Sequence, residues 1–75
     1  MEMVTHPDTT LMVATLTKTA PRRWMLMLWD GQGEYRKTDW YKTKNDALQA
    51  LYLHCRQLRI TGEEIFSQWR RWPRP

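Results

Sequence analysis

Residues 24–29, with the sequence WMLMLW, constrain the fold more than any other part of the chain. The run is far too short to span a bilayer, and glycine-containing turn residues follow it, so it indicates a strand. Side chains alternate between the two faces of a sheet. The two resulting sets are Trp24, Leu26 and Leu28 on one face and Met25, Met27 and Trp29 on the other. Because neither set is polar, we expect both faces of this strand to be covered.

Two coverings remain open at this stage. The chain can cover the strand itself, with one helix on each face. Alternatively, one face is left for a second copy or for another protein, because exposed apolar patches mark interaction sites. In that case the protein interface consists of Met25, Met27, Trp29 and the outward-facing Leu53.

The remaining pattern predicts an α+β domain, a three-stranded antiparallel meander followed by two helices (β-β-β-α-α). Strands are expected at 11–19, 24–29 and about 34–41, with Asp30-Gly31-Gln32-Gly33 as a hairpin turn. Residues 1–10 show no periodicity and are expected to be a flexible lead-in, which leaves 11–75 as one small domain. The third strand is predicted to place Tyr35, Lys37, Asp39 and Tyr41 on one face and Arg36, Thr38 and Trp40 on the other.

The first helix is expected to start at Thr43, an N-cap residue with Asp46 three residues later. Its apolar stripe is Ala47, Leu48, Leu51, Tyr52, Cys55 and Leu58. A second helix is predicted after the capping box that begins at Thr61, with a stripe formed by Ile65, Phe66, Trp69 and Trp72.

Composition narrows the function classes. In a chain of 75 residues with a net charge of +4, a mild preference for anionic partners is expected. Cys55 is the only cysteine, so no intramolecular disulfide is possible and a reducing, cytoplasmic setting is expected. The N-terminal residues do not resemble a secretory signal, and we expect a soluble protein without a membrane partner.

Catalysis is not expected, and neither is a metal or a cofactor. His54 and Cys55 are neighbours in the sequence, so on a helix they diverge by about 100° and cannot act as a base and nucleophile pair. Cys55 lies within the apolar stripe, where a thiol is usually buried and inert. The sequence contains no glycine-rich phosphate loop and no paired-carboxylate motif.

Basic residues gather around the first turn and around the entry to the first helix. In an antiparallel meander these two regions lie at the same end of the sheet, so we expect one basic edge with Trp24, Trp40 and Tyr41 interleaved. We expect the cations of such an edge to hold phosphates while its rings stack on bases. The predicted phosphate-binding residues are Lys18, Arg22, Arg23, Lys42 and Lys44, with Trp40, Arg70 and Arg71 as secondary contacts. The competing interpretation is that turns and strand ends are charged for solubility alone.

Residues 24–51 resemble the small DNA-binding domains of phage-type tyrosine integrases (arm-binding domains) and their AP2-like relatives. The shared order is Trp24, the two glycines of the hairpin, Arg36 and Lys37, then the sequence YKTKNDA at 41–47. The resemblance implies a three-stranded sheet with one helix and contact with DNA. The chain departs from that pattern where the DNA-facing side of the sheet carries Leu, Met and Trp instead of Arg and polar residues.

Two functions therefore follow from the sequence. The first is a non-enzymatic regulatory protein of the phage or mobile-element kind that docks on nucleic acid or a nucleoprotein complex. The alternative is an inhibitor or adaptor that binds a host protein, or self-associates, through the apolar sheet face.

Overall fold

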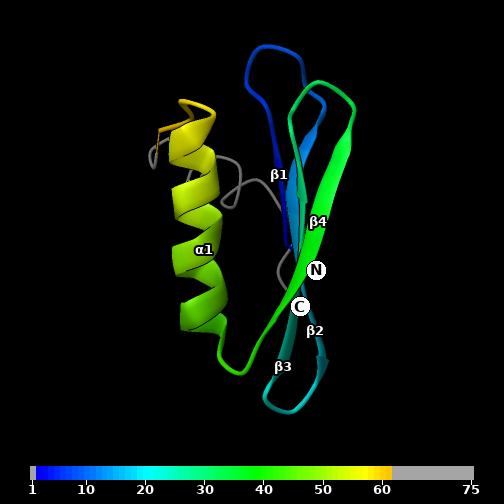
Figure 1. Cartoon of the computed structure of the whole chain (residues 1–75), viewed down its shortest axis with the longest axis vertical. Helices are drawn as coiled ribbons and strands as arrows, with labels where there is room; N and C mark the ends of the chain where they lie inside the picture. The colour runs from blue at the N-terminus through cyan, green and yellow to red at the C-terminus, as the bar shows by residue number, and fades with distance from the viewer. Residues whose placement is uncertain (1, 62–75) are drawn as a thin grey trace.

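The computed structural model describes residues 2–61, which form a four-stranded antiparallel sheet followed by one helix (Figure 1). In chain order the elements are β1 (Glu2–Thr5), β2 (Met12–Ala20), β3 (Arg23–Trp29), β4 (Tyr35–Tyr41) and α1 (Lys44–Gln57). The α+β class and the antiparallel meander are confirmed. The predicted number of three strands is wrong, because residues 2–61 form a sheet of four; within these residues one helix follows the sheet. The helix predicted after Thr61 falls on residues 62–75, which lie outside the described residues.

Strand β1 occupies part of the segment that was predicted to be a flexible lead-in. It pairs with β2 in the register Glu2↔Leu16 and Val4↔Ala14. Val4 is completely buried in the core. The free energy gained by this burial offsets part of the conformational entropy lost in ordering a strand that is only 4 residues long. A strand this short shows no clear alternation of apolar and polar residues, so the sequence pattern did not predict it. Its stability comes from pairing with β2.

The two faces of β3 are covered unequally. Leu26 and Leu28 face α1 and are buried, with Leu16 and Leu51 among their companions in the core. Met25 and Met27, on the face away from α1, are half-buried. Within residues 2–61, no helix covers that second face (Figure 1). The expectation of one helix on each face is therefore met on one side by the described part of the chain.

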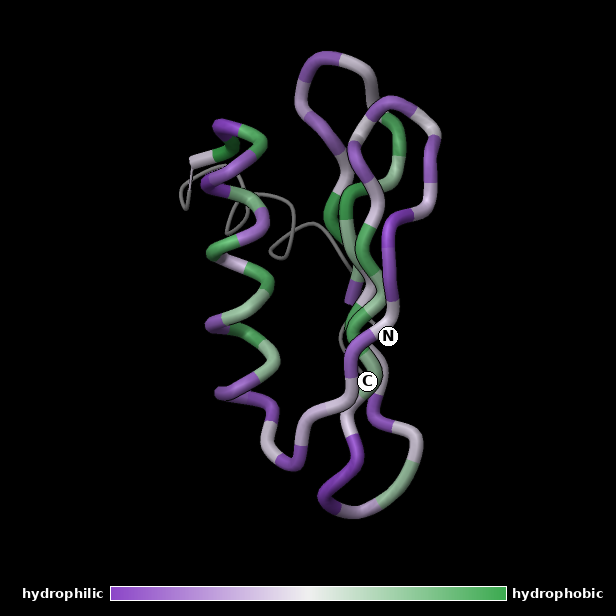
Figure 2. Tube along the Cα trace, in the orientation of Figure 1, coloured by the Kyte–Doolittle hydropathy of each residue, from purple (hydrophilic) through white to green (hydrophobic). Residues whose placement is uncertain are grey.

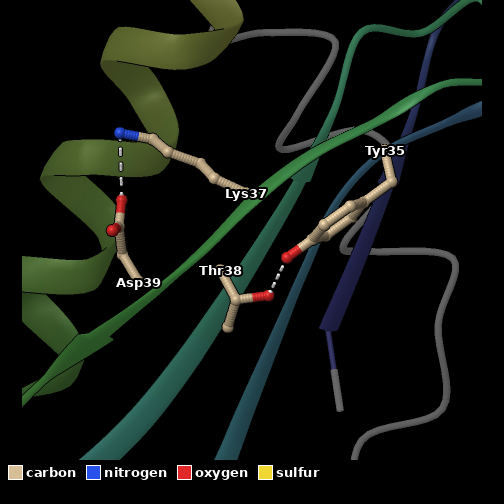
Figure 3. Close-up of polar contacts among 4 residues, drawn as sticks. All are labelled: Tyr35, Lys37, Thr38 and Asp39. Atoms are coloured by element: carbon tan, nitrogen blue, oxygen red, sulfur yellow. Dashed lines mark hydrogen bonds and ion pairs between the residues drawn. The ribbon is translucent and has the colours of Figure 1, made fainter.

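The first residue of β4 lies on the opposite face from the one predicted. The register shifts between Leu28 and Trp29, so that Leu28 pairs with Lys37 while Trp29 pairs with Tyr35, and Arg36 becomes the extra residue of a bulge. Tyr35 therefore shares a face with Thr38, to which its hydroxyl is hydrogen-bonded. Lys37 and Asp39, which form an ion pair at 3.2 Å, lie on the helix side (Figure 3).

Helix α1 begins and ends with recognised capping arrangements. At its start, the backbone N–H of Asp46 donates to Thr43 Oγ1 at 3.1 Å, which confirms the predicted cap. At its end, the N–H of Ile60 donates to the carbonyl of Cys55 at 2.8 Å and the N–H of Arg59 donates to that of Arg56 at 3.0 Å. This pair of bonds is a Schellman motif, with Arg59 at a φ of 61° where glycine is usual.

The predicted apolar stripe of α1 is confirmed, since Ala47, Leu51 and Cys55 are buried against the sheet. Leu53 points outward, as expected, and is 56% exposed. Within residues 2–61 no helix is long and apolar enough to cross a membrane.

Candidate nucleic-acid interface

The end of the sheet formed by the β2–β3 hairpin and the β4–α1 turn collects basic side chains. The register pairs Lys18 with Trp24 and Trp24 with Tyr41, so the ends of three strands meet there. The predicted grouping at one end of the sheet is thus confirmed. We call it the basic end, defined by Lys18, Arg22, Arg23, Lys42 and Lys44, all of which are exposed. In Figure 2 one side of the hairpin tip and the turn before α1 are strongly hydrophilic, while the other side of the tip is pale green.

Two tryptophans are packed against these cations on opposite faces of the sheet. On the helix side, Lys18 Nζ and Lys44 Nζ lie 5.9 Å and 5.7 Å from the ring centre of Trp24. On the other side, the Arg23 guanidinium lies 4.6 Å from the ring centre of Trp40. These are cation–π distances, so the rings hold the cations in place without neutralising them.

The five cations differ in whether a carboxylate already binds them. Lys44 Nζ lies 2.8 Å from Glu2 Oε1, which satisfies much of its charge. Among residues 2–61, no carboxylate lies within ion-pair distance of the other four: Lys18, Arg22, Arg23 and Lys42. Asp46, in the first turn of α1, is at the same end but pairs with none of them. The basic end therefore retains a local excess of positive charge.

The opposite end of the molecule is electrically mixed. Four cations lie toward it, on β4, in the last turn of α1 and just after that helix: Arg36, Lys37, Arg56 and Arg59. Three carboxylates lie toward the same end, in the β1–β2 and β3–β4 loops: Asp8, Asp30 and Glu34. Asp39 pairs with Leu26 and lies in the middle of the sheet, level with Glu2. The opposite end of the described residues therefore has a smaller excess of positive charge than the basic end.

Arg22 has an unusual backbone conformation at the tip of the β2–β3 hairpin. Ala20 pairs with Arg23, so Pro21 and Arg22 form a two-residue turn, and Arg22 has a φ of 58°. A proline followed by a residue of positive φ is the pattern of a type II turn, whose second central position favours glycine. An arginine at this position strains the backbone, and such strain clusters at functional sites.

The residues predicted as a protein interface do not form one surface. Met25, Met27 and Trp29 share the sheet face away from α1, whereas Leu53 lies on the outer side of the helix, in the other layer. Trp29 also packs edge-to-face on Tyr35, with ring centres 5.7 Å apart. Leu53 therefore cannot contribute to the same contact as the methionines. Arg70 and Arg71 lie outside the described residues.

The Cys55 thiol is buried, and the His54 ring is hydrogen-bonded to the backbone. Burial raises the pKa of the Cys55 thiol to about 12, so it is protonated at neutral pH. His54 Nε2 donates to the carbonyl oxygen of Trp29 at 2.7 Å, and this bond ties α1 to the end of β3. His54 also lines an open pocket of about 360 Å³ with Asp30, Arg36 and Lys37, among other residues.

Residues 2–61 contain no cluster of three or more side chains that could ligate a metal. The absence of an enzymatic activity remains a prediction. Comparison with known proteins finds no match among family models, curated proteins or solved structures.

Proposed function

We propose that this domain binds nucleic acid through its basic end. The observation that carries the proposal is the collection, at one end of the sheet, of four exposed cations without an acidic partner among residues 2–61. Phosphates complement such a group, and each contact releases condensed counterions from the nucleic acid. The resemblance of residues 24–51 to arm-binding domains, which rests on the sequence alone, points to the same class of ligand.

Salt dependence tests the proposal on the full chain. A labelled oligonucleotide is titrated with protein at 50 and 200 mM salt. With four phosphate contacts, the slope of log affinity against log salt is about −3 to −4, so affinity falls roughly 50- to 150-fold over that range. A variant in which the four unpaired cations of the basic end are replaced by glutamine should lose nearly all of this dependence.

A matched variant controls for net charge. Replacing Arg36, Lys37, Arg56 and Arg59 by glutamine removes the same charge from the opposite end, and it should leave the slope almost unchanged. Absence of binding at 50 mM salt, or equal losses in the two variants, would contradict the proposal.

The rival function is protein binding or self-association through Met25, Met27 and Trp29. An apolar contact responds weakly to salt, and burial of these side chains drives it. A dimer mass by light scattering at both salt concentrations, together with no oligonucleotide binding, would favour this rival.

A further inference from the structure

Trp40 lies at the basic end with an unusually open ring. It is on the edge strand β4, on the sheet face away from α1, and it is 49% exposed. Its cross-strand partner is Met25, and the Arg23 guanidinium packs on the ring at 4.6 Å. A large aromatic side chain that remains half exposed on an edge strand contributes little to the core. It does offer a flat apolar surface next to unpaired cations.

The other two tryptophans of the described residues are less exposed than Trp40. Trp24 is half-buried at the margin of the core and has Lys18 and Lys44 within cation–π distance. Trp29 is half-buried and packs on Tyr35. Trp40 also has a cation against its ring, Arg23, but among residues 2–61 it is the most exposed tryptophan and has the most ring surface open to a partner.

We infer that the nucleic acid taken by the basic end is single-stranded, with one base stacked on Trp40 while Arg22, Arg23 and Lys42 hold the adjacent phosphates. The inference rests on the proposed function and specifies its ligand. Stacking on an indole requires a base whose face is free, which a single strand supplies and a continuous duplex does not. Every base has such a face, so the contact tolerates any sequence.

The sheet face next to Trp40 also disfavours reading of a duplex. A sheet that recognises a duplex through the major groove presents hydrogen-bonding side chains to the base edges. The cross-strand partner of Trp40 on this face is Met25, and Met27 lies two residues further along β3; neither has a strong donor or acceptor. The polar side chains beside the two methionines are short threonines, Thr17 opposite Met25 and Thr38 opposite Met27. A methionine beside an indole ring suits the face of a base better than its edge.

The test compares one labelled oligothymidine with a duplex of equal length, each titrated with the full chain at 50 mM salt. The wild-type protein should bind the single strand at least about 10-fold more tightly than the duplex. Trp40→Ala should weaken single-strand binding roughly 5- to 150-fold, the range for loss of one base–aromatic stack, and leave duplex binding nearly unchanged. Its salt slope should equal that of the wild type because the phosphate contacts remain. Trp40→Phe keeps a ring and should recover most of the affinity.

Tyr35 provides a matched control. It lies on the same strand and the same sheet face as Trp40, it is 51% exposed, and it is at the opposite end of the strand. Tyr35→Ala should therefore leave binding unchanged. Circular dichroism and thermal unfolding verify that all variants are folded before they are compared.

The outcomes separate the two proposals. No binding of either probe at 50 mM salt would overturn the proposed function together with this inference. Salt-dependent binding in which the duplex is bound as tightly as the single strand would overturn only the inference. So would a Trp40→Ala variant that loses no more single-strand affinity than Tyr35→Ala.

Discussion

Replacing Arg22 by glycine should stabilise the protein and weaken its binding at the same time. Arg22 has a φ of 58°, and a left-handed conformation costs a residue with a Cβ atom about 1–2 kcal/mol. Glycine adopts this conformation without that cost. It also makes the unfolded chain more flexible, which lowers the free energy of unfolding by about 0.4–1 kcal/mol. The net expectation is a gain of about 0.5–1 kcal/mol, which corresponds to a rise in melting temperature of about 2–8 °C in a domain of this size.

Arg22→Ala is the control that isolates the backbone effect. It removes the same charge and the same side-chain length but keeps the Cβ atom, so it should be no more stable than the wild type. Urea and thermal unfolding followed by circular dichroism measure both variants. If the glycine and alanine variants were equally stable, the reasoning about strain at the hairpin tip would be refuted.

The same substitutions test whether the strain accompanies function. If Arg22 contacts a phosphate, both variants should lower the magnitude of the salt slope by about 0.7–0.9, one contact's worth. Arg59→Gly relieves an equivalent strain, at a φ of 61°, at the far end of α1. It should raise stability to a similar extent without changing oligonucleotide binding.

Three further outcomes follow from the core, the β3–β4 turn and the buried thiol. Leu26→Ala, at a completely buried position under α1, should lower the free energy of unfolding by about 2–5 kcal/mol in urea titrations. The backbone N–H groups of Gln32 and Glu34 donate to Asp30 and lower its pKa, so its stabilisation is complete above the ordinary carboxyl pKa near 4 and is lost as pH falls through the depressed value. Asp30→Ala should therefore flatten the acid limb of the stability–pH profile, and an unchanged limb would contradict this assignment. Because burial raises the pKa of Cys55 to about 12, a thiol reagent at pH 8 should modify it only at the rate at which the native protein opens; rapid labelling of the folded protein would contradict its burial.

Local patterns predicted most of the elements correctly. The apolar run at 24–29, the glycine-containing turn after it and the cap at Thr43 each depend on neighbours in sequence, and all three are confirmed. The basic end was also predictable, because a meander brings alternate turns to the same end of a sheet. The ion pair that removes Lys44 from the free cations was not, since Glu2 lies 42 residues away.

The features that the sequence did not predict depend on contacts between distant residues. Strand β1 is stabilised by pairing with β2 and by burial of Val4, and neither is visible in a stretch of 4 residues. The bulge at Arg36 places Tyr35 on the sheet face opposite to the one predicted. It is caused by the way β4 pairs with β3, and the sequence of β4 alone does not indicate it. The positive φ of Arg22 was not predicted either, because arginine is not a residue type that usually adopts this conformation.

The order β1-β2-β3-β4 means that every strand lies beside its neighbour in the sequence, and this has a consequence for how the chain reaches its structure. Each hairpin closes only a short loop, so the entropy lost in bringing partners together is small at every step. Proteins built from contacts of low sequence separation fold fast for their size. During synthesis the sheet can therefore assemble hairpin by hairpin as the strands leave the ribosome, and α1, the last element of the described chain to emerge, closes over it.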